Sequence, residues 1–143
     1  MKPWFKYERI PVVLASSYEK ASRMVIDGYY SQVADEITSH IRQGSMLDLG
    51  TGPGYLPIEI VRRAPELHIT GVDLSRRLTR IAHVNAKKAG FASQLTFEVG
   101  NSSRLRFDHA VFDMVISTGM LHSLKKPIHV LTEIRRVLKD GAE

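Results

Sequence analysis

The sequence predicts an α/β protein built on a parallel sheet, and three observations lead to that fold class. Short apolar runs alternate along the 143 residues with stretches of helical periodicity, an order typical of parallel sheets with right-handed crossovers. A glycine-rich segment follows the first apolar run, at the kind of position where such sheets bind ligands. The composition, 43% hydrophobic and 24% charged, is that of a single globular domain.

The first 44 residues are expected to form a helical cap, and residues 45–143 to form the core. After an irregular opening, residues 17–43 carry apolar side chains at steps of three and four, which form one stripe along a helix. The stripe consists of Ile26, Tyr30, Val33, Ile37 and Ile41. We expect Gly28 to bend or break this stretch into two helices, and Gly44 to end it.

Four short segments predict strands, at residues 46–49, 68–73, 95–99 and 112–117, the third of them because its apolar residues alternate with polar ones. Three other segments predict helices, at residues 54–64, 75–89 and 127–141. Pro57 is tolerated because it falls in a first turn, where the amides lack partners. Ser75 is expected to cap its helix, and Gly90 and Gly141 to end theirs.

Composition and charge argue against several classes of protein. The chain has no cysteine, which excludes a disulfide scaffold, a thiolate metal site and a Cys nucleophile, and fits a reducing compartment. The net charge of +5 comes from separated pairs of basic residues, which argue against a dedicated nucleic-acid surface. The histidines show no paired metal-binding spacing. The longest early apolar stretch, residues 10–15, is too short for a membrane span or a signal-peptide core, so we expect a cytoplasmic protein without a metal.

The segment DLGTGPG, residues 48–54, follows the first predicted strand. Glycine at alternate positions lets the backbone turn sharply and approach a ligand closely. The helix behind it offers free amides and a positive dipole end, which suit a carboxylate or a phosphate. Tyr55 stands where the dinucleotide fingerprint needs a glycine, and no Gly-Lys-Ser/Thr follows. A tight strand-to-helix turn without a ligand is the alternative interpretation.

Asp73 ends the second predicted strand, 19 residues after Gly54. An acidic residue at about this separation can accept both hydrogen bonds of a ribose diol. Capping of the next helix together with Ser75 is its alternative role. Beside a glycine loop, ribose binding is the favoured interpretation.

Four motifs in the same order resemble those of the class I S-adenosylmethionine-dependent methyltransferases, especially the small-molecule group that includes the quinone-biosynthesis enzymes. They are MLDLGTGPG at 46–54, GVDLS at 71–75, FDMVIS at 112–117 and LTEIRRVLKDG at 131–141. The resemblance covers about residues 17–141 and implies a Rossmann-like sheet with strand order 3-2-1-4 and helices on both faces. It also implies transfer of a methyl group from S-adenosyl-L-methionine to a small-molecule acceptor.

Two other functions stay open. A cofactor-binding fragment or regulatory module would hold S-adenosyl-L-methionine without a complete acceptor site. A nicotinamide-dependent oxidoreductase would need the glycine that Tyr55 replaces, which argues against it.

The resemblance implies a set of cofactor-binding residues. In it the glycines let the methionine part lie against the backbone, Asp48 faces the amino group, and Asp73 holds the ribose hydroxyls. Leu74 packs on the adenine, and Ser117 and Thr118 lie beside the methionine and the sulfonium. The full set is Tyr18, Asp48, Gly50, Thr51, Gly52, Gly54, Asp73, Leu74, Asn101, Ser102, Ser117 and Thr118.

Two residues have a functional and a plain interpretation. Tyr18 stands where the family often places an aromatic ring over the cofactor, and such a ring attracts a sulfonium; helix packing is the alternative. His122 is the one candidate base, and a loop histidine bonded to backbone is the alternative. Methyl transfer is an in-line displacement that depends on alignment, so the sequence assigns no residue firmly to catalysis.

The chain departs from the family's pattern at two places. Asn101-Ser102 stands where the family has an acidic and then a small residue, so we expect the Asn101 carbonyl oxygen to accept from the adenine amino group without charge. The chain also lacks the family's last three strands, which makes the fourth strand an edge with unpaired backbone groups. A truncation of a longer protein, a homo-oligomer or the N-terminal helices would account for this edge.

Overall fold

The computed structural model describes the backbone of residues 12–118 and 124–143, and within these ranges the side chains from residue 24 onward. Its elements in chain order are α1 (Val12–His40), β1 (Gln43–Leu49), α2 (Tyr55–Arg63), β2 (Glu66–Asp73), α3 (Arg76–Ala89), β3 (Leu95–Val99), β4 (Met114–Ile116) and α4 (Pro127–Val137). The four strands form one parallel sheet in the order β3-β2-β1-β4. The predicted α/β class and strand order are therefore confirmed.

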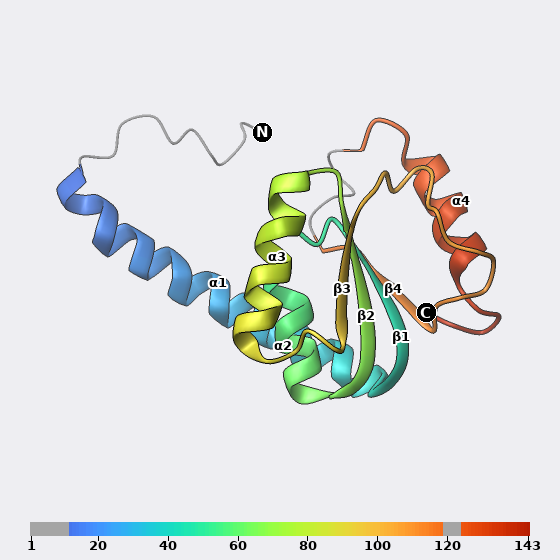
Figure 1. The fold of residues 1–143 in the computed structure, drawn as a ribbon, viewed down its shortest axis with the longest axis horizontal. Coiled ribbons are helices and arrows are strands. Elements are labelled where there is room, and N and C mark those ends of the chain that lie inside the picture. Colours follow the sequence, from blue (N-terminus) through green and yellow to red (C-terminus); the bar gives the residue numbers. More distant parts are fainter. Residues whose placement is uncertain (1–11, 119–123) are drawn as a thin grey trace.

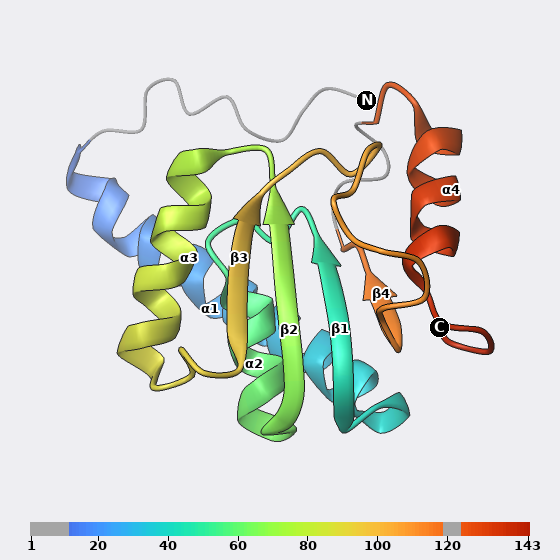
Figure 2. The same ribbon diagram turned by 45° about the vertical axis from the view of Figure 1, so that its right-hand side comes forward.

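Helices cover both faces of the sheet (Figure 1). α1, α2 and α3 lie on one side of it and α4 lies on the other, as the turned view also shows (Figure 2). Met46 packs with Ala34 of α1 in the cluster on the first side. Its neighbour Leu47 packs with Val130 and Val137 of α4 in the cluster on the second side. Burial on both sides explains why the second half of β1 is a nearly continuous apolar run, whereas β3 at the edge of the sheet alternates.

α1 is a single helix of 29 residues, so the predicted break at Gly28 is wrong. A Cβ at Gly28 would have no neighbour within 4 Å, and one glycine costs a helix interior only about 1 kcal/mol. Ala34 and Ile37 are buried against the core, whereas Met24 and Val25 are exposed, so α1 packs through its C-terminal part. Among the described helices, α1 included, none is long and apolar enough to cross a membrane.

Two predicted boundaries near the end of the chain are wrong for one reason. α4 ends at Val137 rather than near residue 141, because Leu138 adopts an extended conformation. Phe112 donates its N–H to the Val137 carbonyl at 3.0 Å, and Lys139 donates its N–H to the Phe112 carbonyl at 2.9 Å. Phe112 therefore pairs with the chain after α4, and β4 starts only at residue 114.

The outer edge of β4 is partly covered by the end of the chain. Val115 donates its N–H to the Glu143 carbonyl at 2.8 Å, and Glu143 donates its N–H to the Asp113 carbonyl at 3.4 Å. The two bonds flank Met114, which is the pattern of one parallel rung. Within the described part of the chain, Glu143 rather than α1 is what pairs with this edge.

Candidate functional site

The loop after β1 turns through glycines in left-handed conformations. Gly50, Gly52 and Gly54 have φ angles of 75°, 56° and 79°, which L side chains rarely adopt. The N–H groups of Gly50 and Thr51 donate to the carbonyl oxygen of Val72 on β2, at 2.8 and 3.1 Å. A Cβ on Gly52 would meet no atom within 4 Å. The loop is thus held against β2 while its backbone borders open space at Gly52.

The first turn of α2 follows this loop and has no side-chain cap. Its N-cap is Gly54, and the turn holds no acidic residue. A Cβ on Gly54 would lie 3.0 Å from the Phe97 ring and 3.1 Å from Ala82, so close packing of α2 on its neighbours excludes a capping side chain. The uncapped amides and the positive dipole end of α2 are therefore available to an anionic group.

Asp73 joins the ends of β1 and β2. Its Oδ2 accepts a hydrogen bond from the Gly52 N–H at 2.9 Å, and its Oδ1 accepts one from the Ser75 N–H at 2.8 Å. Ser75 in turn caps α3 by accepting from the Leu78 N–H at 3.2 Å. The predicted capping arrangement is therefore present, and each carboxylate oxygen keeps capacity for a further hydrogen bond.

Asp48, near the end of β1, is buried in the sheet face that α1 and α2 cover. Its side chain is 2% exposed, and its register partners are Gly71 on β2 and Ile116 on β4. Position 71 leaves room for Thr51, because a Cβ there would lie 2.5 Å from Thr51 Oγ1. Burial raises the pKa of the Asp48 carboxyl to about 7; the nearby Thr51 hydroxyl opposes this rise, and the Asp73 carboxylate adds to it.

Two buried hydroxyls, one just after β1 and one just after β4, lack a hydrogen-bond partner among the described residues. Within residues 24–118 and 124–143, the hydroxyls of Thr51 and Ser117 have no hydrogen-bond partner, so Thr51 affects the Asp48 pKa without forming a well-aligned bond to its carboxyl. Ser117 directly follows Ile116, the register partner of Asp48. Such groups are rare in native proteins unless a ligand or water satisfies them, so each hydroxyl is available to a polar ligand at the carboxyl edge of the sheet.

Tyr30 on α1 is close enough to Asp48 for the carboxylate charge to affect the Tyr30 phenol, a relationship that the sequence did not indicate. Burial is the first cause that raises the pKa of the Tyr30 phenol, and the charge of Asp48 is the second. The Tyr30 ring packs near that of Tyr55 on α2, with 6.2 Å between the centroids. Helical periodicity predicted that Tyr30 faces the protein, but it cannot say which side chain of another element Tyr30 meets.

A pocket of about 460 Å³ lies at the carboxyl ends of β2 and β3 and the start of α4. Leu74 on its wall is 72% exposed, so this apolar side chain has little contact with the core. Oδ1 of Asn101 accepts from the N–H and the hydroxyl of Ser103, at 2.9 and 2.8 Å. The predicted bond from an adenine amino group to this oxygen therefore requires the Ser103 hydroxyl to turn away. The lining residues are Leu74, Asn101, Ser102, Ser103, Leu124, Lys125, Lys126 and Val130.

Of the remaining predicted site residues, the structure describes the side chain of Thr118 but not those of Tyr18 and His122. Thr118 is exposed just beyond β4, one residue after Ser117. The side chain of Tyr18, and His122 as a whole, lie outside the described residues. The predictions for these two residues therefore stay predictions.

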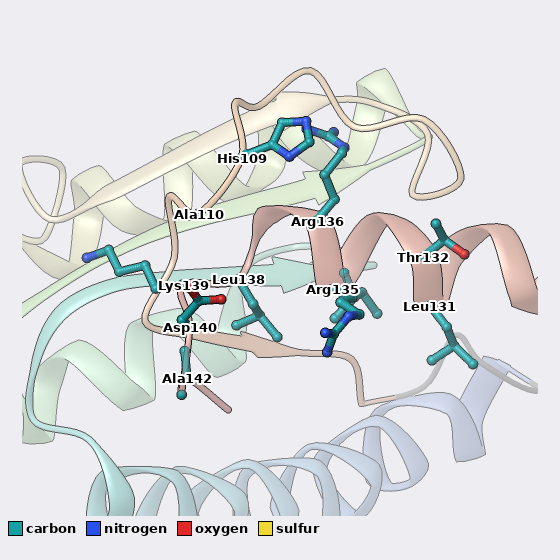
Figure 3. Close-up of a pocket in the computed structure, with 12 residues that line it drawn as sticks. His109, Ala110, Leu131, Thr132, Arg135, Arg136, Leu138, Lys139, Asp140 and Ala142 are labelled. Atoms are coloured by element: carbon teal, nitrogen blue, oxygen red, sulfur yellow. The ribbon is translucent and has the colours of Figure 1, made fainter.

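A separate hollow of about 580 Å³ lies along α4 and the segment after it (Figure 3). Its lining comes from residues 109–110, from the exposed side of α4, and from residues 138–142. None of the predicted site residues contributes to it. The hollow is therefore distinct from the glycine loop and from the pocket beside Leu74.

Comparison with known proteins settles the family. The sequence model of the family described as a methyltransferase domain matches residues 46–141. These residues include the glycine loop, Asp73 and α4. The chain belongs to the methyltransferase domain family. Among related sequences, a ubiquinone/menaquinone biosynthesis C-methyltransferase of Geobacter sp. (strain M21) is 28% identical over 145 residues. The alignment covers 96% of this chain and 62% of the length of the relative.

Solved structures show the same fold as this methyltransferase domain. A protein of Methanococcus maripaludis, described as an S-adenosyl-L-methionine-dependent methyltransferase, aligns with a TM-score of 0.81 at 22% identity, over 99% of this chain and 65% of that one. The geranyl diphosphate C-methyltransferase of Streptomyces coelicolor A3(2), solved with S-adenosyl-L-homocysteine, aligns with a TM-score of 0.70 at 21% identity. That alignment covers 78% of this chain and 42% of the neighbour.

Proposed function

We propose that this protein binds S-adenosyl-L-methionine along the carboxyl edge of its sheet and transfers the methyl group to a small-molecule acceptor. The observation that carries the proposal is the bond between the Asp73 carboxylate and the Gly52 N–H at 2.9 Å. It brings a group suited to a ribose diol and a glycine loop open to a ligand to the same place. Membership of the methyltransferase domain family supports the same cofactor.

The residues present fit such a cofactor at its methionine end. The uncapped first turn of α2 suits the carboxylate. Asp48 suits the ammonium group, because it is a buried carboxyl to which no cation among the described side chains is paired. The unsatisfied hydroxyls of Thr51 and Ser117 supply further hydrogen bonds to the polar methionine end, and Thr118 lies beyond them. Open space over Gly52 leaves room for the chain that joins these groups to the sugar.

The residues at the nucleoside end fit as well. Each oxygen of Asp73 can accept one more hydrogen bond, so the two ribose hydroxyls can bind without displacing the Gly52 amide. The exposed Leu74 side chain offers an apolar surface to the adenine ring. Asn101 and Ser102 line the same pocket and border the edge of the base.

The chain contributes mainly orientation to the reaction. When bound, the cofactor supplies an electrophilic methyl group on a sulfonium. Asp73 fixes the sugar, the first turn of α2 fixes the carboxylate, and the buried Asp48 carboxyl orients the ammonium group. Alignment of this kind can account for about 7–11 kcal/mol of a barrier. His122 remains our candidate for a base if the acceptor must lose a proton.

The acceptor is proposed from the relatives. The chain spans 62% of the length of its Geobacter relative, and a demethylmenaquinone methyltransferase of Porphyromonas gingivalis is 29% identical over 133 residues. These names support quinone precursors as the first acceptors to try. The alternative, a module that binds the cofactor but lacks a complete acceptor site, predicts binding without transfer.

Isothermal titration with S-adenosyl-L-homocysteine and with NAD tests the cofactor. We expect the first to bind at one site per chain and NAD to give no heat of binding. Incubation with methyl-labelled S-adenosyl-L-methionine and a demethylated quinone then tests the transfer. Binding of NAD instead of the homocysteine compound would contradict the proposal, and binding without transfer to any acceptor in a cell extract would favour the binding module.

A further inference from the structure

The pocket beside Leu74 has two walls that come from separate parts of the chain. One wall is the turn at residues 101–103, and the other is the start of α4, with Lys126 and Val130. The turn follows β3 and α4 follows β4, and these two strands lie at opposite edges of the sheet. Pairing within the sheet therefore does not join the walls directly, and other contacts must fix the distance between them.

Glu133 and Arg136 on α4 make such a connection. Oε2 of Glu133 accepts a hydrogen bond from the Leu105 N–H at 2.7 Å. Arg136 donates from Nη2 to the Leu105 carbonyl oxygen at 3.1 Å, and from Nη1 to the Phe107 carbonyl oxygen at 2.6 Å. Both polar groups of the Leu105 backbone are thus held by side chains of α4, and these two side chains form a clamp on residues 105–107.

The two side chains of the clamp also hold each other. Arg136 donates from Nε to Oε1 of Glu133 and from Nη2 to Oε2, both at 2.8 Å, which is the paired geometry of a strong charge-assisted contact. They are only 22% and 18% exposed. Arg136 is the first cause that lowers the pKa of the Glu133 carboxyl, and the Leu105 N–H lowers it further, although burial opposes them. The clamp is therefore a charged pair of fixed shape.

The clamped segment is tied closely to the turn that forms the opposite wall. The Arg104 N–H donates to the Asn101 carbonyl oxygen of the backbone at 3.0 Å, which closes the turn. Within the turn, Oδ1 of Asn101 accepts from the Ser103 N–H. Leu105 is buried in the same cluster as Val130 of α4. A shift of Leu105 relative to α4 would therefore move Asn101 as well.

We propose that Glu133 and Arg136 are positioning residues that give the pocket its selectivity for adenine. They act through Asn101, because the clamp fixes the turn against α4 and so holds the side-chain oxygen of Asn101 where the adenine amino group reaches it. Neither residue is among those that line the pocket, so neither is a catalytic residue. This inference rests on the proposed function, because it assumes that the base of the cofactor lies in this pocket.

Two ligands that differ only in the base measure this selectivity in the unaltered protein. S-inosyl-L-homocysteine has a carbonyl oxygen where S-adenosyl-L-homocysteine has the amino group, so it offers the Asn101 oxygen no donor at that position. We expect isothermal titration to show the adenosyl compound binding about tenfold more tightly, because an unpaired polar group in a pocket costs affinity. Equal affinities would overturn the inference without any need for a variant.

Glu133→Gln tests the clamp, because the amide keeps the length of the side chain and loses the charge that pairs with Arg136. Its affinity for S-adenosyl-L-homocysteine should fall about three- to tenfold, and its preference over the inosyl compound should fall towards one. Arg135→Gln is the matched control, because Arg135 is exposed and points in a different direction from Arg136 (Figure 3); it should change neither value. A lower midpoint in urea unfolding with an unchanged preference would assign the clamp to stability alone and overturn the inference.

A double-mutant cycle shows whether the clamp acts through Asn101. In an Asn101→Ala background the oxygen is already absent, so Glu133→Gln should weaken binding of S-adenosyl-L-homocysteine by less than about twofold. An equal loss with and without Asn101 would overturn the inference and leave the proposed function standing. Failure of the unaltered protein to bind either ligand would instead overturn the proposed function.

Discussion

The carboxylate of Asp73 accepts a hydrogen bond from the backbone N–H of Gly52 at 2.9 Å. This bond spans two strands: the end of β2 holds the loop that follows β1. The same carboxylate also anchors Ser75 at the start of α3. One side chain thus fixes the loop shape, the start of a helix and, in our proposal, the sugar of the cofactor.

Asp73→Ala is expected to weaken cofactor binding by about 2–4 kcal/mol, because two hydrogen bonds to the diol are lost and the loop is released. Titration calorimetry measures this loss. A 2′-deoxy analogue of the cofactor should lose affinity for the unaltered protein but lose much less for the variant. Equal affinities of variant and unaltered protein for S-adenosyl-L-homocysteine would remove Asp73 from the site.

Gly52→Ala tests whether the ligand lies against the loop. Gly90 offers a matched control, because both glycines have positive φ, of 56° and 83°, and both would place a Cβ in open space. The two alanine variants should therefore lose similar stability in urea unfolding, about 1–2 kcal/mol each. Only Gly52→Ala should lose cofactor binding, and similar binding by the two variants would show that our placement of the ligand is wrong.

Leu74→Ala should separate a role in the site from a role in the core. The side chain is 72% exposed, so its truncation should change the free energy of unfolding by less than about 0.5 kcal/mol. Binding of adenosine-containing ligands should nevertheless weaken, because the adenine loses an apolar surface. Leu131→Ala, at another exposed leucine outside the proposed site, should leave binding unchanged. A large loss of stability for Leu74→Ala would instead assign this residue to the core.

Asp48→Asn should also change how stability depends on pH in the absence of any ligand. The pKa of the carboxyl rises from 3.8 in its usual state to about 7 in the folded protein. Between these values the folded chain binds more protons than the unfolded chain, so stability falls as pH rises through this window. The amide removes that loss, so the variant should gain stability relative to the unaltered protein at pH 8 but not at about pH 4. Parallel pH profiles of the two proteins would contradict the buried, neutral carboxyl.

Asp113 should affect the pH dependence of stability in the opposite direction to Asp48, because its pKa is lowered rather than raised in the folded protein. Its carboxylate accepts from Lys139 Nζ at 2.9 Å and from the N–H and hydroxyl of Ser45, and these partners lower its pKa to about 2. The stability that it contributes is therefore complete above about pH 4 and is lost as pH falls towards 2. Asp113→Asn should lower the urea midpoint at pH 7 and flatten the acid limb of the stability profile. An unchanged acid limb would mean that the pair contributes little, as exposed ion pairs often do.

The glycine loop could be predicted because it depends on local signals, whereas the strand order came from the resemblance of the four motifs to a known family. Alternate glycines and short apolar segments can be seen directly in the sequence, and the four motifs occur in the order of the family. The end of α4 could not be predicted in this way, because Leu138 leaves the helix to let its neighbours pair with Phe112, which lies far away in sequence. The prediction of a helix break at Gly28 was wrong for a related reason. A glycine permits a bend, but no neighbouring group lies within 4 Å of the Cβ position at Gly28 to impose one.

Part of the candidate site could likewise be predicted from the sequence, and part could be found only in the structure. Asp73 and the glycine loop were visible from their spacing, and the structure brings them into direct contact. The electrostatic influence of Asp48 on Tyr30, and the use of the Asn101 carbonyl oxygen by Ser103, both depend on side-chain packing. Neither has a sequence pattern of its own, so both had to come from the structure.

A crystal structure of the protein with S-adenosyl-L-homocysteine tests the central claim most directly. We predict that both ribose hydroxyls lie within hydrogen-bond distance of the Asp73 carboxylate, that the adenine lies on Leu74, and that the amino group points to Asp48. A ligand bound elsewhere, with the space over Gly52 filled by the protein's own side chains, would contradict the account.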